Sequence, residues 1–285
     1  MPQTPQPLVA LLTDFGTSDP YVGIMKGVIA TRCPAARFID ITHEVSPQSV
    51  KQANYLLCAA YRYFPAHTIF LVVVDPGVGT DRQALAIKTD HGIYVGPDNG
   101  VFGGVLEAVD TWQAVVLWPP EQLSATFHGR DLFAPAAAAL ANGQALHKIG
   151  TPTVDVVQAP LLHAELVAPG KIEGEVLHID HFGNIITSIG PLEWERSSNG
   201  APSNLLSWRS EVQIDAAEIG VTLASYEIKG IQATYESPSP LPPSHTIAII
   251  NSDNMLEIAI NKGSAAEYTS ARLGDVVTLT FTPRS

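Results

Sequence analysis

The sequence predicts an α/β N-terminal domain with a mostly parallel sheet, followed by a C-terminal antiparallel β-barrel domain. Short apolar runs alternate with helical patterns over residues 8–150, as in chains that build a sheet covered by helices. After about residue 170 the pattern changes to short, β-rich segments separated by turns. The length of 285 residues suits two domains of ordinary size.

The elements of the N-terminal domain, residues 1–150, follow from hydrophobic periodicity. We predict strands at 8–13, 36–41 and 68–75, and helices from Pro20 to about Arg32 and from about Ser46 to Phe64. The run IFLVVV is apolar at every position, which is typical of a strand covered by helices on both faces. Beyond it we expect a hairpin-like pair from ALAIKT and GIYVG, a helix from NGVFGGVLEAV, and a last helix from DLFAPAAAALANG that ends at Gly143.

The C-terminal part is predicted to be mainly strand. Residues 151–170 contain three prolines and a glycine with little periodicity, which predicts a linker. The domain at 171–285 takes its strands from KIEGEVLHID, NIITSI, EVQIDAAEIGVTLA, HTIAII, MLEIAI and DVVTLTF. Two polar segments, RSSNGAPSN at 196–204 and SPSPLPPS at 237–244, predict solvated connections.

Composition and charge exclude several classes of protein. The net charge of −12 repels polyphosphates, so we expect no nucleic-acid partner. With 46% hydrophobic and 15% charged residues the chain is globular rather than disordered. We expect no membrane span and a cytoplasmic location, because no run of about 20 apolar residues is present and no basic segment precedes the first apolar run. Cys33 and Cys58 lie in apolar patterns and are expected to be buried thiols.

Residue types that are frequent in active sites gather in three loops. Two of these loops follow predicted strands, and the third precedes the last predicted helix. Open α/β sheets bind their ligands at the carboxyl ends of the strands. These loops are TDFGTSDPYVG with Asp14 and Asp19, DPGVGTDR with Asp75 and Arg82, and TFHGRD with His128 and Arg130. Taken singly, the first two aspartates are equally well explained as helix caps, and the second loop as a structural ion pair. Together, an Asp, an Arg and a His on neighbouring loops form a set that can orient and deprotonate a water.

Other motifs are excluded as functional signatures, because the residues that should accompany them are missing from the sequence. TDFG lacks the glycine-rich loop, the strand lysine and the HRD loop of kinases, and VDPGVGTDR lacks the GK[ST] ending of a phosphate-binding loop. Neither HExxH nor paired-cysteine spacing is present. We therefore expect neither a metal nor a cofactor.

Seven segments together resemble the S-adenosylmethionine hydroxide adenosyltransferases, relatives of the fluorinase and chlorinase enzymes. The segments are LLTDFGTSDPYVGIMKGVI, ITHEVSPQSVKQANYLL, VVVDPGVGTDR, GPDNGVF, TFHGRDLFAPAAA, IDHFGNIITSI and NSDNMLEIAINKGSAA. The resemblance covers both domains. It implies hydrolysis of S-adenosylmethionine to adenosine and L-methionine, by a homotrimer whose active sites lie between the N-terminal domain of one subunit and the C-terminal domain of the next.

Residue roles follow from matching the motif positions. The resemblance implies a water-activating triad of Asp75, Arg82 and His128. It also implies substrate-binding residues: Asp14 for the ribose hydroxyls, Asp19 near the methionine end, Asp180 for the methionine ammonium, Phe182 and Asn184 for adenine, and Ser252, Glu257 and Ile260 for the rest of the pocket. Two positions depart from the family pattern. Asp253 stands where an Arg or Gly is frequent, and Gln48 stands where the halogenases have an aromatic residue.

Two alternatives to hydrolysis remain open, a halide transferase of the same fold and a non-catalytic nucleoside or S-adenosylmethionine sensor. In the fluorinase-like branch the positions matching Asp75, Val78, His128 and Gly129 carry Tyr, Thr, Tyr and Ser, which build a neutral pocket with hydroxyl donors. The carboxylate and imidazole at these positions favour water as the nucleophile. A pure sensor has no use for an Asp-Arg-His set around one site.

Overall fold

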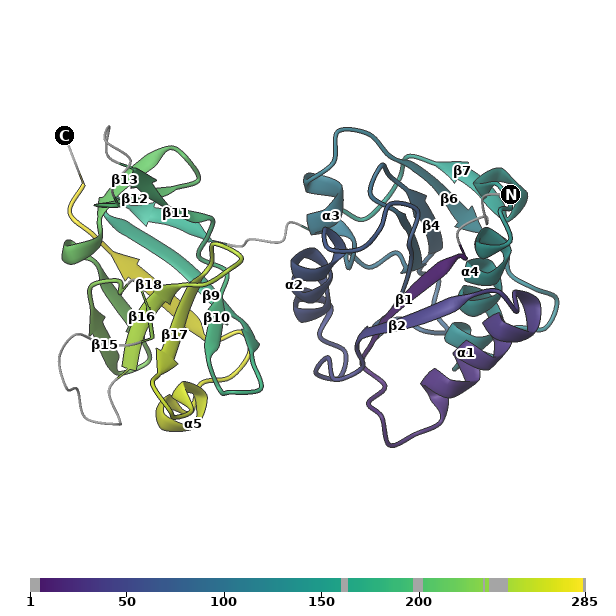
Figure 1. Ribbon diagram of the computed structural model, residues 1–285, viewed down its shortest axis with the longest axis horizontal. Coiled ribbons are helices and arrows are strands. Elements are labelled where there is room, and N and C mark those ends of the chain that lie inside the picture. Colours follow the sequence, from purple (N-terminus) through teal and green to yellow (C-terminus); the bar gives the residue numbers. More distant parts are fainter. Residues whose placement is uncertain (1–5, 160–163, 197–201, 233, 236–245, 284–285) are drawn as a thin grey trace. The chain divides into compact units, whose positions relative to one another are not determined.

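The computed structural model describes residues 6–159, 164–196, 202–232, 234–235 and 246–283 (Figure 1). The chain separates into two compact units, residues 1–161 and 162–285, and each is described by itself. The predicted polar segment at 237–244 lies outside the described residues, as does 197–201 within the segment at 196–204.

The N-terminal unit is built on a seven-stranded sheet in the order β2-β1-β3-β5-β4-β6-β7. Its strands are β1 Leu8–Thr13, β2 Arg37–Thr42, β3 Ile69–Val73, β4 Ala84–Lys88, β5 Ile93–Pro97, β6 Gln113–Leu117 and β7 Gly150–Thr153. The neighbours among β2, β1, β3 and β5 pair in parallel, whereas β5–β4, β4–β6 and β6–β7 are antiparallel. The sheet is therefore mixed. The prediction of a mostly parallel sheet is wrong, because three of the six strand pairs are antiparallel.

The antiparallel half of this sheet starts from a hairpin. Strands β4 and β5 form the predicted pair, and the turn is closed by the Thr89 N–H, which donates to the Gly92 carbonyl at 2.9 Å. So short a connection permits only antiparallel pairing. Strands β6 and β7 lie outside the predicted elements. β7 begins at Gly150 and overlaps the range 151–170 that was predicted as a linker, and Pro152 is tolerated there because β7 is the edge strand of the sheet.

The helices of this unit are α1 Tyr21–Arg32, α2 Val50–Tyr61, α3 Gly103–Glu107 and α4 Ala134–Ala141. α1 agrees with its predicted range. α2 begins later than Ser46, because Gln48 has a φ of 66°, which a right-handed helix cannot contain. The predicted last helix begins as a π-helix at Gly129–Phe133 before α4, and Gly143, with a φ of 82°, follows its end as expected.

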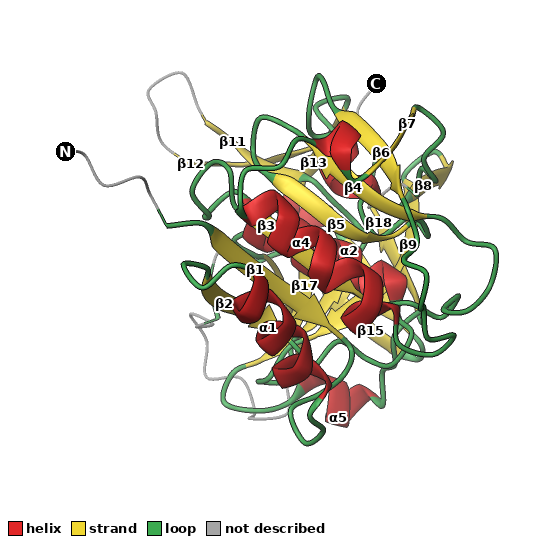
Figure 2. Cartoon of the chain, turned by 90° about the vertical axis from the view of Figure 1, so that its right-hand side faces the viewer, coloured by secondary structure: helices red, strands yellow, loops and turns green. Residues whose placement is uncertain are grey.

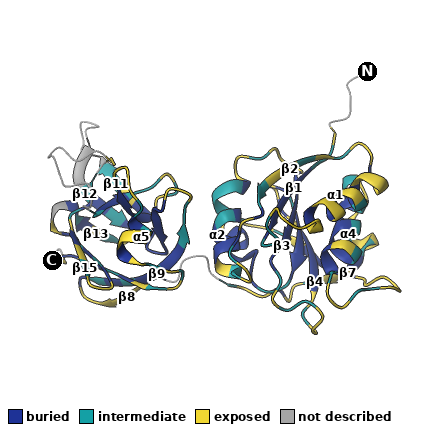
Figure 3. Ribbon diagram, turned by 90° about the horizontal axis from the view of Figure 1, so that it is seen from below, coloured by how far each residue is buried: buried dark blue, intermediate teal, exposed yellow. Residues whose placement is uncertain are grey.

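Both faces of the parallel strands are covered by helices (Figure 2). Alternate residues of β1 enter different cores: Val9 and Leu11 pack with α1 and α4, and Ala10 and Leu12 pack on the other face with α2 and α3. Figure 3 shows β1 and β3 as buried, and β2 and the outer side of α1 as partly or fully exposed. Each fully buried Leu contributes roughly 1.5–3 kcal/mol relative to an exposed one, so this alternation holds the strand ends in place.

The C-terminal unit contains a nearly closed, antiparallel, barrel-like sheet, as the sequence predicts. Its main path runs β15-β14-β18-β9-β10-β17-β16, β8 pairs with β9, and β15 approaches β16. The strands are β8 Glu165–Ala168, β9 Lys171–Ile179, β10 Ile185–Thr187, β14 Gly220–Leu223, β15 Tyr226–Lys229, β16 Thr246–Ile250, β17 Leu256–Ile260 and β18 Val276–Thr280. A separate three-stranded sheet consists of β11 Leu192–Arg196, β12 Pro202–Trp208 and β13 Val212–Asp215, and the short helix α5 spans Ala265–Thr269.

Both cysteines are free thiols; Cys33 is buried and Cys58 is partly buried. Burial raises the pKa of Cys58 to about 12, so its thiol stays protonated at neutral pH. Within the ranges that the structure describes, we find no helix with the length and apolarity to cross a membrane.

Candidate active site

Two of the candidate loops leave the same edge of the N-terminal sheet. β1 and β3 are parallel neighbours, and Thr13 pairs with Val73 in register. Asp14 follows Thr13 directly, and Asp75 comes two residues after Val73. Because neighbouring strands lie about 4.8 Å apart, both carboxylates start from adjacent positions at the carboxyl ends of the strands.

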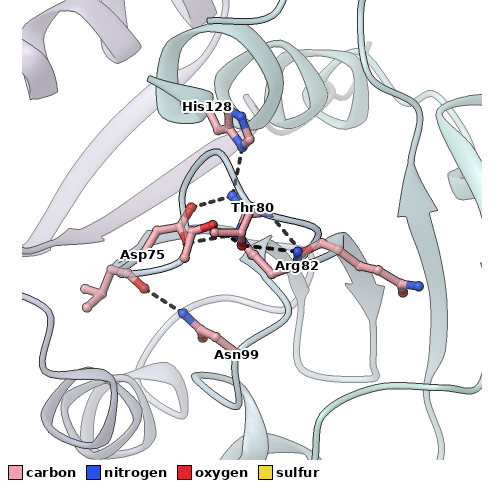
Figure 4. Close-up of polar contacts among 8 residues, drawn as sticks. Asp75, Thr80, Arg82, Asn99 and His128 are labelled. Carbon is pink, nitrogen blue, oxygen red and sulfur yellow. Dashed lines mark hydrogen bonds and ion pairs between the residues drawn. The ribbon is translucent and has the colours of Figure 1, made fainter. Parts of the chain in front are cut away.

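Arg82 and Asp75 form a buried, bidentate ion pair (Figure 4). Arg82 Nε donates to Asp75 Oδ1 at 2.8 Å, and Arg82 Nη2 donates to Asp75 Oδ2. The two side chains are only 10% and 6% exposed. The guanidinium also lies over the ring of Phe133, 5.2 Å from its centroid. A paired geometry of this kind fixes both groups in one orientation.

His128 completes the cluster. Arg82 Nη2 lies 2.9 Å from His128 Nδ1, and His128 is 7% exposed. Since arginine has only donors, Nδ1 accepts this hydrogen bond, and the neutral imidazole carries its proton on Nε2. Burial, and then the charge of Arg82, lower the pKa of His128 below its usual value. At neutral pH the cluster therefore presents an N–H donor from an uncharged imidazole.

The loop from Asp75 to Arg82 has a fixed conformation that brings it against the segment before His128. Gly79 has a φ of 80°, and a Cβ there would lie 2.5 Å from the Ala125 carbonyl oxygen, so only glycine fits. Asn99 Nδ2 donates to the carbonyl of Val74, the residue before Asp75, at 2.9 Å. Asn99 belongs to GPDNGVF, one of the seven segments that resemble the family, and this motif is the signal that could have pointed to its role.

Asp14 and Asp19 lie in the same loop. Among the contacts of the described residues, only Asp14 is bound by a neighbouring segment. The backbone N–H of Gln48 donates to Asp14 Oδ2 at 2.8 Å, and Asp19 is exposed just before α1. Three aromatic rings in mutual contact, with centroids 5.3–6.0 Å apart, join this loop to the residue before His128; they belong to Phe15, Tyr21 and Phe127. The Asp14 loop therefore packs against the His128 loop.

The C-terminal unit contains a pocket of about 550 Å³, a size within the usual range for small-molecule sites. It is lined by Asp180, Phe182, Asn184, Tyr235, Ile260, Asn261, Lys262 and Gly263. Four of the predicted binding residues are thus together in one pocket. Ser252 is not among the lining residues and is exposed in the turn between β16 and β17.

The Asp180 carboxylate shapes one wall of this pocket. Its Oδ1 accepts from the backbone N–H groups of Phe182 and Asn184 at 2.9 and 2.8 Å, and its Oδ2 accepts from Asn184 Nδ2 at 3.0 Å. These bonds use three of roughly four acceptor positions of a carboxylate. Gly183, with a φ of 81°, is required because a Cβ would lie 2.1 Å from Ser264 Oγ. The turn leaves the ring of Phe182 74% exposed.

Tyr235 lines this pocket and forms a polar pair with Glu257, which is not itself among the lining residues. Glu257 is 4% exposed, and the Tyr235 hydroxyl donates to its Oε1 at 2.9 Å. Burial first, and then the charge of Asp180, raise the pKa of Glu257, although the bond from Tyr235 opposes the rise. The sequence analysis missed Tyr235, because a single tyrosine beside a polar, proline-rich segment carries no periodicity or motif.

Family models match most of the chain. The models of the S-adenosylmethionine hydroxide adenosyltransferase N-terminal and C-terminal domains match residues 9–150 and 174–278. The chain belongs to this family. The resemblance inferred from the seven sequence segments is therefore confirmed.

Relatives of this adenosyltransferase family match along nearly the full length. The chain is 35% identical to an (R)-S-adenosyl-L-methionine hydrolase of Thermus thermophilus, over 95% of this chain and 98% of that protein. It is 28% identical to a fluorinase of Nocardia brasiliensis, over 83% and 92%. A crystal structure of an uncharacterised conserved protein from Thermotoga maritima has a TM-score of 0.78 at 32% identity, over 95% of this chain and 99% of that one.

Proposed function

We propose that this chain hydrolyses S-adenosyl-L-methionine to adenosine and L-methionine, by in-line attack of an activated water on C5′. The observation that carries the proposal is the buried cluster of Asp75, Arg82 and His128 at the carboxyl ends of the parallel strands. Relatives that are 34–35% identical over most of the chain are named (R)-S-adenosyl-L-methionine hydrolases, which supports this reaction.

The reaction requires the enzyme to activate and position the nucleophile and requires little else of it. A sulfonium is already an excellent leaving group, so no acid is needed to protonate it. The enzyme must hold an oxygen in line behind C5′ and keep bulk water out. Proton and methionine both leave without any change of oxidation state, and we propose that no cofactor takes part.

Asp75 is the group of the cluster that can take the proton from the attacking water. The guanidinium of Arg82 has no acceptor, and His128 Nδ1 already accepts from Arg82. Each oxygen of Asp75 accepts one N–H of Arg82 and keeps a further lone pair. We assign His128 Nε2–H the role of stabilising the incipient hydroxide by a hydrogen bond, and Arg82 the role of holding Asp75 and His128 in place around it.

The remaining predicted residues bind the substrate in this proposal. Asp14 takes the ribose hydroxyls, and Phe182 and Asn184 take the adenine in the C-terminal pocket. Asp19 and Asp180 attract the cationic methionine end, because opposite charges favour each other in a site of low dielectric constant. Glu257 supports the pocket wall through its contact with Tyr235, and Ile260 lines the same pocket.

The free thiols agree with the cytoplasmic location that we propose.

The oxygen that enters adenosine should come from solvent. In oxygen-18 water, the label is expected in the 5′-hydroxyl of adenosine, because the attacking group is water, and L-methionine should be released in equal amount. Mass spectrometry of the nucleoside measures the label. Adenine or S-adenosylhomocysteine as the product, or unlabelled adenosine, would contradict hydrolysis at C5′.

The enzyme should work as a homotrimer in which the two halves of each site come from different subunits. Phe182, although 74% exposed, lines the pocket that we assign to adenine, and such an apolar ring is suited to be covered by a neighbouring subunit. Light scattering should give about three times the chain mass of 30.4 kDa. A mixture of two inactive variants, one in each half-site, should regain activity. A fully active monomer would refute this arrangement.

A further inference from the structure

We propose that His43 is a positioning residue for the ribose end of the substrate site: its buried imidazole fixes Thr13 and so the orientation of Asp14. The inference rests on the proposed function, in which Asp14 binds the ribose hydroxyls. His43 lies in the segment ITHEVSPQSVKQANYLL, and the resemblance to the family implies no role for it.

A chain of polar contacts runs from the surface into the end of β1. Lys26 Nζ on α1 contacts Asp40 Oδ2 on β2 at 2.6 Å, and Asp40 Oδ1 lies 3.0 Å from His43 Nε2. His43 Nδ1 in turn lies 2.9 Å from Thr13 Oγ1. Asp40 and Lys26 are partly exposed, His43 is 6% exposed, and Thr13 is fully buried.

The polar contacts from Thr13 through His43 to Asp40 have one consistent direction of hydrogen donation. The backbone N–H of Phe15 donates to Thr13 Oγ1 at 3.3 Å, and because a hydroxyl oxygen can accept two hydrogen bonds, the direction of the Thr13–His43 contact is set by the other ring nitrogen of His43. A carboxylate can only accept, so the proton of the neutral imidazole sits on Nε2, which lies 3.0 Å from Asp40 Oδ1 without hydrogen-bond alignment, and Nδ1 accepts from the Thr13 hydroxyl. Burial raises the pKa of Asp40, but the contacts with Lys26 and His43 outweigh this effect and hold that pKa below its usual value. Asp40 therefore stays charged and fixes the tautomer of His43.

The backbone around His43 holds the Asp14 loop from the same side. The Gly16 N–H donates to the His43 carbonyl at 2.8 Å, and the Val45 N–H contacts the Thr13 carbonyl at 3.4 Å. Gln48, in its left-handed conformation, directs its N–H to Asp14 Oδ2. A non-glycine residue keeps such a conformation only where its surroundings impose it, which is typical of ligand-binding segments.

A purely structural role would be served better by apolar residues. His43 and Thr13, the buried members of this network, lose hydration, and replacing both partners of a buried hydrogen bond by apolar groups of the same shape can be nearly neutral or stabilising. The network lies directly beside the residue proposed to bind ribose and on a different strand from Asp75. Loss of the His43 contact should therefore weaken ribose binding and leave the chemical step unchanged.

The test compares variants that keep or lose the contact to Thr13. In His43→Gln the amide can reach Asp40 but not Thr13, and in Thr13→Val the hydroxyl is replaced by a methyl group of similar size. Both should raise KM for S-adenosylmethionine about tenfold, with kcat within about twofold of the wild type. His43→Asn retains an acceptor near the Nδ1 position and should restore most of the affinity. His147→Gln, at an exposed histidine, is the matched control and should change neither constant.

Calorimetry with two nucleosides separates positioning of Asp14 from general damage to the fold. His43→Gln and Thr13→Val should weaken adenosine binding about tenfold and leave the binding of 2′,3′-dideoxyadenosine unchanged, because that ligand lacks the hydroxyls that Asp14 binds. Equal weakening of both ligands, or unchanged adenosine binding, would overturn the inference. Failure of the wild type to release methionine from S-adenosylmethionine would instead refute the proposed function, while the nucleoside comparison still tests the role of His43.

Discussion

Replacing Asp75, Arg82 or His128 by alanine is expected to lower kcat for S-adenosylmethionine hydrolysis by at least about 100-fold in each case. General-base and electrostatic contributions of this kind are typically worth two to four orders of magnitude. Adenosine affinity should change little, because the cluster acts on the water rather than on the nucleoside. Single-turnover rates and calorimetric binding constants measure the two effects separately.

The three losses should not add. Arg82 bonds to both of the other side chains, so removing any one member disrupts the arrangement of the rest. The double variant of Asp75 and His128 should be about as slow as the slower single variant. Losses that multiply would show that the residues act independently. Glu173→Gln, at an exposed ion pair with Lys171, is the control and should retain full activity.

The pH profile gives an independent check of the imidazole. Burial and Arg82 lower the pKa of His128, so the neutral form, which accepts from Arg82, dominates at neutral pH. Activity should be constant above neutrality and fall as pH drops below the usual histidine range, where a protonated Nδ1 would face the guanidinium. His128→Asn, which removes the titrating group, should be slow and lack this acidic limb.

The sequence was informative about the cluster because strand order and residue type suffice for it. Asp75 follows an apolar run that could only be a central strand, and ligands bind beyond such strands. The direction of the hydrogen bond into His128 Nδ1, which makes the imidazole a donor, depends on side-chain geometry that no spacing encodes. Tyr235 was missed for the same reason, since its role comes from the contact with Glu257 rather than from a pattern.

The fold was predictable where periodicity is strong. β1 and β3 are apolar on both faces, and helices cover both faces. The predicted hairpin of β4 and β5 already implies one antiparallel pair, but the addition of β6 and β7 was not predictable, because β7 is a short edge strand that contains Pro152 and pairs with a strand some 33 residues earlier in the sequence. The start of α2 was shifted by Gln48, whose backbone serves Asp14 rather than the helix.

The choice between water and halide follows from the charge and space around the nucleophile. A halide beside Asp75 would meet a like charge in a desolvated site, at a cost on the order of several kcal/mol, and the bidentate bond already commits Arg82 to that carboxylate. A hydroxyl donor at residue 129 is not available either. A Cβ on Gly129 would lie 2.9 Å from Met25 Sδ and 3.0 Å from the Phe127 ring, so the serine of the fluorinase-like branch would fit only if these two side chains moved.

Adenosine should therefore remain the sole nucleoside product in molar chloride or in high fluoride. Water is neutral, so it avoids the repulsion by Asp75 that a halide meets, and it gains a proton acceptor that a halide cannot use. Liquid chromatography against authentic 5′-chloro- and 5′-fluoro-5′-deoxyadenosine measures the product ratio, and a parallel series in sulfate of equal ionic strength controls for salt effects on the rate. Formation of either halogenated nucleoside at a rate comparable to that of adenosine would refute the hydrolytic assignment in favour of a halide transferase.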